Sequence, residues 1–219
     1  MSFADILKDN SEDIWKKILK HIFIHEISND VLPNEKFIFY LLQDKIFLKE
    51  FCIFLDKAMK ISMDENIKKW INELIYSTVN HEMKMQNDLL EMLRYTNNTK
   101  TTIQANEITL NYIFDMKKLL QDTSKLYEVI SFMAPCPWTY FEIAEKIKNE
   151  NRIKNEVSKK WLKFYSSDES KQQVEFLKEL LNELSKELTV TDKTKMKNLF
   201  NKACQNELDF WKMSYYTVN

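Results

Sequence analysis

The chain contains no glycine among its 219 residues. At an average usage of roughly 7%, a chain of this length would hold about fifteen glycines. Glycine-rich phosphate-binding loops need positive φ angles and close approach of the backbone, which other residues resist. The absence therefore excludes a Walker loop and a Rossmann fingerprint, and with them the commonest ATP and NAD sites. Tight β-hairpins also lose their preferred turn residue, so we expect an all-helical chain.

The charge balance and the cysteine content narrow the class of protein further. A formal net charge of −1 provides no basic field, so we expect no nucleic-acid partner. The first residues lack the pattern of a signal peptide, and no apolar run is long enough to span a bilayer, so we expect no membrane partner. Three cysteines, an odd number, indicate reduced thiols in a cytoplasmic protein.

Apolar residues recur at helical spacing along most of the sequence, without an internal repeat, a linker or a low-complexity segment. We therefore expect one helical domain over residues 1–219, with a polar connection over residues 97–105. Ser2 with Asp5, and Ser62 with Glu65, have the spacing of capping pairs at helix starts.

One cysteine lies between two of the three prolines of the chain. Pro135 and Pro137 flank Cys136 inside a segment with helical periodicity, which places Cys136 and Tyr140 on the buried face. A proline inside a helix costs about 3 kcal/mol, a strain that a functional site would justify. The alternative is a bent core helix with an inert buried cysteine.

Two carboxylates occupy the centres of apolar helix faces. Asp44 lies in the stripe from Phe37 to Met59, and Glu207 lies in the stripe of the last helix. A buried, unpaired carboxylate costs several kcal/mol or becomes protonated. Asp44 therefore needs either an ion pair, a bond to a backbone amide, or a functional role. If the helices form a bundle, Asp44, Cys136 and Glu207 can converge on one interior pocket equipped for covalent catalysis and proton transfer.

His21 and His25 are four residues apart, as helical metal ligands can be. Neither belongs to a Glu-x-x-His or His-Glu-x-x-His pattern, so we expect no metal site and no cofactor. A heme on a single proximal histidine remains open as an alternative.

The motifs, in their order along the chain, resemble the TenA (thiaminase II) family, which has the all-helical heme-oxygenase-like fold. The resemblance covers most of the length. The matching stretches are His21 to Ile27, Leu32-Pro33, Phe37 to Phe51, Pro135-Cys136-Pro137-Trp138-Thr139-Tyr140-Phe141-Glu142, Trp161 to Ser167, and Glu207 to Met213.

The resemblance implies an enzyme of thiamin salvage that hydrolyses 4-amino-5-aminomethyl-2-methylpyrimidine or thiamin, cleaving the substituent from the C5 methylene. By that analogy Cys136 adds to the pyrimidine ring as the nucleophile. Asp44 holds and polarises the ring nitrogen and the amino group. Glu207 is the general acid and base for the leaving group and for water. Members of this family commonly form tetramers, so a homotetramer is expected.

The same resemblance implies residues that hold the ring, and here the chain departs from the family. Tyr140 and Tyr165 are expected to hydrogen-bond around the cysteine and the glutamate, and Phe47 to line the ring pocket where many members have tyrosine. Ile108 begins the segment that matches the aromatic ring clamp, so stacking on that face is lost unless Tyr112 turns in. The usual Glu-x-x-x-His is Glu82 to Gln86 here.

Two alternatives use the same scaffold: an enzyme that acts on another small heterocycle, or a non-catalytic regulatory or interaction protein. The reactivity of the thiol separates a site from a core position, because a pocket thiolate should be alkylated faster than a free thiol.

Overall fold

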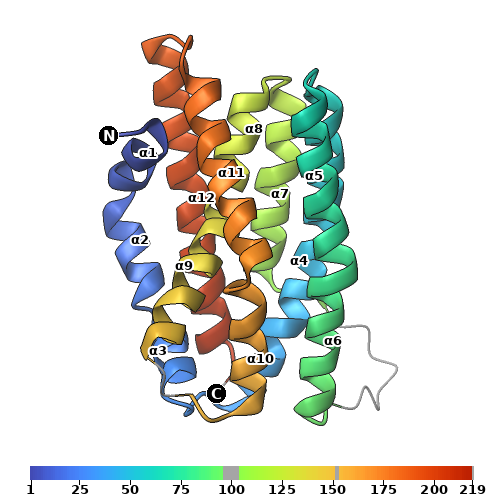
Figure 1. Ribbon diagram of the computed structural model, residues 1–219. Coiled ribbons are helices and arrows are strands. Elements are labelled where there is room, and N and C mark those ends of the chain that lie inside the picture. The colour runs from blue at the N-terminus through green and yellow to red at the C-terminus, as the bar shows by residue number, and fades with distance from the viewer. Residues whose placement is uncertain (96–103, 151–152, 219) are drawn as a thin grey trace.

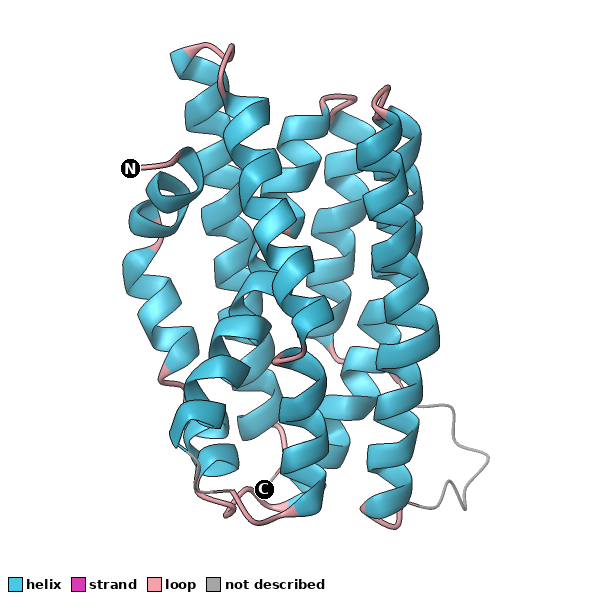
Figure 2. Ribbon diagram, in the orientation of Figure 1, coloured by secondary structure: helices cyan, strands magenta, loops and turns pink. Residues whose placement is uncertain are grey.

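The computed structural model describes residues 1–95, 104–150 and 153–218, and these residues form helices and no strand (Figure 2). The expected all-helical class is confirmed; most of the expected connection over residues 97–105 lies outside the described residues. The elements are α1 (Phe3–Asn10), α2 (Glu12–Leu19), α3 (Ile22–Ser28), α4 (Asn34–Ile61), α5 (Glu65–Ser77), the π-helical turn η1 (Thr78–Glu82), α6 (Met83–Met92), α7 (Glu107–Asp122), α8 (Leu126–Met133), α9 (Pro135–Glu150), α10 (Glu156–Tyr165), α11 (Asp168–Ser185) and α12 (Val190–Tyr216).

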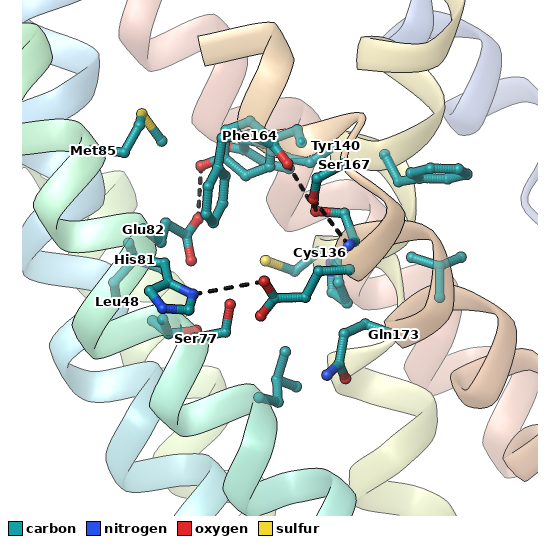
Figure 3. Close-up of a pocket in the computed structure, with 18 of the residues that line it drawn as sticks. Leu48, Ser77, His81, Glu82, Met85, Cys136, Tyr140, Phe164, Ser167 and Gln173 are labelled. Atoms are coloured by element: carbon teal, nitrogen blue, oxygen red, sulfur yellow. Dashed lines mark hydrogen bonds and ion pairs between the residues drawn. The ribbon is translucent and has the colours of Figure 1, made fainter. Parts of the chain in front are cut away.

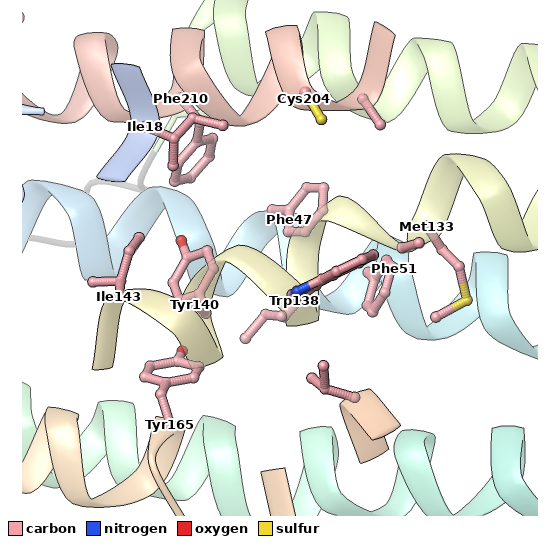
Figure 4. Close-up of a cluster of buried hydrophobic side chains, with 14 of the residues drawn as sticks. Ile18, Phe47, Phe51, Met133, Trp138, Tyr140, Ile143, Tyr165, Cys204 and Phe210 are labelled. Atoms are coloured by element: carbon pink, nitrogen blue, oxygen red, sulfur yellow. The ribbon is translucent and has the colours of Figure 1, made fainter. Parts of the chain in front are cut away.

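The two longest helices, α4 and α12, organise the bundle. Helix α12 packs against α1, α2, α3, α4, α7, α8 and α9, and α4 packs against α5, α6, α7 and α8 (Figure 1). Every α-helix contributes side chains to one hydrophobic core. Phe47 and Phe51 of α4, Trp138 of α9 and Phe210 of α12 belong to this core (Figure 4). The apolar stripes of α4 and α12 therefore bury their carboxylates inside the protein.

The expected capping pair at the first helix is confirmed. The Asp5 N–H donates to Ser2 Oγ at 3.2 Å, and the Ser2 N–H donates to Asp5 Oδ2 at 3.0 Å. Such a reciprocal pair satisfies two backbone donors that have no partner inside the helix.

The expected capping pair of Ser62 and Glu65 is wrong. The Asp64 carboxylate caps α5, accepting from the N–H groups of Asn66 at 2.7 Å and Ile67 at 3.2 Å. Ser62 Oγ instead accepts from the Asp64 N–H at 3.2 Å. A charged acceptor forms a stronger bond to the helix start than a hydroxyl does, and this decides which residue caps.

The expected strain of two prolines in mid-helix is also wrong. Helix α8 ends at Met133, and Pro135 is the first residue of α9. The first four N–H groups of a helix have no intrahelical partner, so Pro135 and Pro137 remove no ladder bond there. Cys136 is consequently the second residue of a new helix.

No helix in the described part of the chain is long and apolar enough to cross a membrane.

Candidate active site

A pocket of about 380 Å³ opens beside the start of α9. Residues of α4, α5, η1 and α6 line one side of it, and residues of α9, α10 and α11 line the other (Figure 3). Its volume lies within the range of roughly 300–1,000 Å³ that is usual for small-molecule sites. Asp44, Cys136, Tyr140 and Tyr165 are among the lining residues, so four of the side chains named from the sequence border one cavity.

The Cys136 thiol is partly exposed and borders the cavity. Burial raises its pKa well above the ordinary value, and the nearby carboxylates of Glu207, Glu82 and Asp44 raise it further. At rest the sulfur is therefore protonated. The expectation of a thiolate that alkylates faster than a free thiol is not supported by these surroundings, and nucleophilic use of Cys136 requires a base that removes its proton.

Glu207 is a candidate for such a base, although it is not among the residues that line the pocket. Its side chain is only 2% exposed, and Oε1 accepts a hydrogen bond from the Tyr112 hydroxyl at 2.8 Å. Burial raises the pKa of Glu207 to about 7, although hydrogen bonds from Tyr112 and from the Cys136 thiol lower it in part. None of the ion pairs found among the described residues includes Glu207. A carboxylate in this state can both accept and donate a proton near neutral pH.

Asp44 lies on α4 and is 4% exposed. Gln86 Nε2 donates to its Oδ2 at 2.5 Å, and the Tyr40 hydroxyl lies 3.5 Å from the same oxygen. Burial raises the pKa of Asp44 well above its ordinary value, and the charges of Glu82 and Glu207 add to the effect. Among the described residues its partners are thus an amide side chain and a hydroxyl side chain, and neither an ion pair nor a bond from a backbone amide, the two structural alternatives, is found.

The two tyrosines of the site pack together, with ring centroids 4.9 Å apart. The Tyr165 hydroxyl donates to Glu82 Oε1 at 2.6 Å. Its partner is therefore Glu82, whereas the sequence led us to expect a bond near Cys136 or Glu207.

Glu82 is a site residue that sequence reasoning missed. It ends the π-helical turn η1, lines the pocket, and has its pKa raised to about 7, chiefly by burial. Gln86, the partner of Asp44, was missed as well. The sequence does contain a signal that could have pointed to both residues. The segment from Glu82 to Gln86 has glutamine where the family pattern Glu-x-x-x-His has histidine.

Three of the expected ring-binding residues do not line the pocket. Phe47 and Tyr112 are buried and pack directly on each other, with ring centroids 4.7 Å apart. Tyr112 reaches the site only through its bond to Glu207. Ile108 borders a separate pocket with Lys202 and is not brought to the site.

On the side of α9 away from the pocket, Glu142 accepts hydrogen bonds from residues of other helices and of α9 itself. Lys8 Nζ lies 2.6 Å and 2.9 Å from its two carboxylate oxygens, Trp15 Nε1 donates at 2.9 Å, and Trp138 Nε1 donates at 2.7 Å. These bonds join α9 to α1 and α2, and they fix the helix that carries Cys136.

His21 serves as a helix cap. Its Nδ1 accepts from the Phe23 N–H at 3.3 Å, and burial lowers its pKa to about 4. Within the described ranges, no group of three or more His, Cys, Asp or Glu side chains is arranged to hold a metal ion.

Known proteins are similar to this chain in sequence and in architecture. The TENA/THI-4/PQQC family model matches residues 8–217. An "Aminopyrimidine aminohydrolase" from Halalkalibacterium halodurans is 28% identical over 216 residues, which cover 98% of this chain and 96% of the relative. The solved "TenA homologue protein from P. horikoshii OT3" is 27% identical, with a TM-score of 0.86, over 98% of this chain and 99% of that one.

A more distant structure identifies the fold. A domain of unknown function from Shewanella denitrificans, described as having a heme oxygenase-like fold, matches with a TM-score of 0.74 at 11% identity, over 97% of this chain and 92% of that one. The expected heme-oxygenase-like fold is confirmed. Since the family model spans nearly the whole sequence, the chain belongs to the TENA/THI-4/PQQC family.

Proposed function

We propose that this protein is an aminopyrimidine aminohydrolase of the thiaminase II type. It would replace the substituent on the C5 methylene of an aminopyrimidine by hydroxyl, using water and releasing ammonia from the aminomethyl substrate. The observation that carries the proposal is that the Cys136 thiol borders the pocket and lies near enough to the buried Glu207 carboxylate for each group to shift the pKa of the other. The pKa of Glu207, about 7, suits a group that moves protons at neutral pH. The names of the relatives supply the substrate class.

In the proposed reaction Glu207 takes the thiol proton while the Cys136 sulfur forms a bond to a ring carbon. The bond from the C5 methylene to nitrogen then breaks, the ammonium group leaves as ammonia, and Glu207 passes its proton to the ammonia that is released. Water adds to the methylene carbon and gives its proton to Glu207. The sulfur–carbon bond then breaks, and Glu207 returns this proton to the sulfur to restore the thiol. The cycle consumes one water and leaves the enzyme unchanged, so Glu207 alternates between base and acid.

Asp44 would hold the ring. Both of its hydrogen bonds within the described residues use Oδ2, through Gln86 and Tyr40. Because the pKa of Asp44 is raised well above its ordinary range, the carboxyl group can donate a proton to a ring nitrogen or accept a bond from the ring amino group. Such a contact polarises the ring toward attack by sulfur.

The proposal is tested by offering the purified protein 4-amino-5-aminomethyl-2-methylpyrimidine and, separately, thiamin. We expect the hydroxymethyl pyrimidine as product in at least one reaction, with one ammonia per product from the amine. Binding of either compound without turnover would favour a regulatory protein instead. Turnover of neither, together with turnover of another heterocycle, would keep the chemistry and change the substrate.

Two related features belong to the same proposal. The family resemblance leads us to expect a homotetramer, and the odd number of cysteines leads us to expect a cytoplasmic protein. The mass of the protein in solution, measured by light scattering, tests the homotetramer.

A further inference from the structure

Three side chains that can accept hydrogen bonds are among those that line the pocket. The carboxylates of Asp44 and Glu82 border it, and Gln173, which also lines it, has a buried Oε1 without a hydrogen-bond partner (Figure 3). Among the described residues each of the two carboxylates accepts hydrogen bonds through one oxygen. The second oxygen of each, together with Gln173 Oε1, favours a ligand that brings its own N–H groups.

Cationic side chains also line the same pocket, but they form ion pairs with other carboxylates or are exposed to solvent. Lys160 Nζ lies 2.6 Å from Asp88, and His81 Nδ1 lies 3.6 Å from Glu169. Lys163 is exposed. The negative charge of the interior is therefore not matched by these residues, and a positively charged ligand complements it.

Glu82 has a different position from that of Asp44. It ends the π-helical turn η1, a geometry that occurs often at functional sites, whereas Asp44 lies on α4 beside Gln86. Both Glu82 and Cys136 border the cavity, and the charge of Glu82 acts on the Cys136 thiol. If the ring is held by Asp44 and attacked by Cys136, the substituent of the ring occupies the remaining cavity. Of the two other carboxylates that line it, Glu169 pairs with His81, whereas Glu82 takes part in no ion pair found among the described residues.

Burial supports this assignment. It raises the pKa of Glu82 to about 7 in spite of the hydrogen bond from Tyr165. A carboxylate that is desolvated without a cation is costly in its charged form, and a bound cation removes that cost.

We propose that Glu82 selects the charge of the substrate, pairing with an ammonium group on the C5 methylene of the aminopyrimidine in preference to a neutral hydroxyl. This inference rests on the proposed function and adds to it the residue that recognises the leaving group. Glu82 is a specificity-determining residue in this account.

The test compares two ligands of nearly equal shape, the aminomethyl pyrimidine and its hydroxymethyl counterpart. Their dissociation constants are measured by titration calorimetry on the Cys136→Ser protein, with and without Glu82→Gln. We expect Glu82→Gln to weaken binding of the amine by about 10- to 100-fold, the range for a bond to a charged group. Binding of the hydroxymethyl ligand should change less than about twofold, because the introduced amide still offers a neutral hydroxyl a hydrogen bond of similar strength.

Two variants separate selection from a structural role. Glu169→Gln makes the same substitution at the edge of the pocket and should leave both constants nearly unchanged. Tyr165→Phe removes the partner of Glu82 and keeps its charge, so the preference for the amine should persist. An equal loss for both ligands in Glu82→Gln, or no loss for the amine, overturns the inference.

The two proposals fail in different ways. A wild-type protein that releases no ammonia from the amine contradicts the proposed function, whatever Glu82 does. A Cys136→Ser protein that does not bind the amine more tightly than the hydroxymethyl ligand overturns the role of Glu82, even where Glu82→Gln does not fold.

Discussion

The two sides of α9 place carboxylates in opposite surroundings. On one side Glu142 receives the ammonium of Lys8 and the indole N–H groups of Trp15 and Trp138. On the other side Glu207 of α12 accepts a hydrogen bond from the Tyr112 hydroxyl and lies near the Cys136 thiol, and none of the ion pairs found among the described residues includes it. A matched charge stabilises structure, whereas an unmatched buried carboxylate holds a proton that it can exchange. The difference separates the side that fixes the helix from the side where we place the chemistry.

The largest effect is expected on the pocket side from Cys136→Ser. The substitution is nearly isosteric but replaces the nucleophile by a hydroxyl that is far harder to deprotonate, so hydrolysis should fall below detection while the melting temperature changes little. Cys52→Ser is the matched control, because Cys52 is a partly exposed thiol that does not line the pocket. Retained activity with lost stability would make Cys136 a structural residue.

Glu207→Gln should have the next largest effect. Glutamine keeps the size and the hydrogen-bonding reach but cannot exchange a proton, so kcat should fall by about 10²–10⁴-fold. Because no cation is stranded by the change, the free energy of unfolding should not fall. Steady-state kinetics of ammonia release measure the first quantity.

Asp44→Asn should weaken binding of the aminopyrimidine by about 1.5–3 kcal/mol, the range for a hydrogen bond to a charged group. Titration calorimetry on the folded variant gives the dissociation constant. An unchanged constant would remove Asp44 from the binding site.

The smallest effect is the pH dependence of stability. The pKa of Glu207 rises from the ordinary 4.5 to about 7 in the folded protein. Between these values the folded state binds more protons than the unfolded state, so stability falls as pH rises from about 4.5 through about 7. Glu207→Gln removes this contribution. From pH 5 to pH 8 the variant should therefore gain about 1–3 kcal/mol relative to wild type in urea unfolding; a constant difference across that range would contradict the assignment.

Much of the fold follows from the sequence alone. The absence of glycine and the helical spacing of apolar residues are local properties, and each constrains the chain without reference to its neighbours. The same spacing allowed Asp44, Cys136 and Glu207 to be identified as candidate site residues, because a polar group within an apolar stripe can be recognised from the sequence of its own helix alone. The resemblance of the ordered motifs added the roles.

The remaining features depend on contacts between helices. Nothing near Tyr165 in the sequence indicates that its hydroxyl meets Glu82, which comes from a turn 83 positions earlier. The direct packing of Phe47 on Tyr112 likewise depends on how α4 and α7 meet. The break at Pro135 is visible as a pair of prolines, but the periodicity continues across it and conceals the start of a new helix.

The most direct test measures unfolding and turnover on two matched variants, Glu142→Gln and Glu207→Gln. For Glu142→Gln we expect a loss of about 1.5–3 kcal/mol in the free energy of unfolding, since hydrogen bonds to a charged group are weakened, with turnover retained within about tenfold. For Glu207→Gln we expect the reverse, a stable protein with almost no turnover. Glu207→Gln that unfolds easily and still turns over substrate would contradict the division of α9 into a structural side and a chemical side.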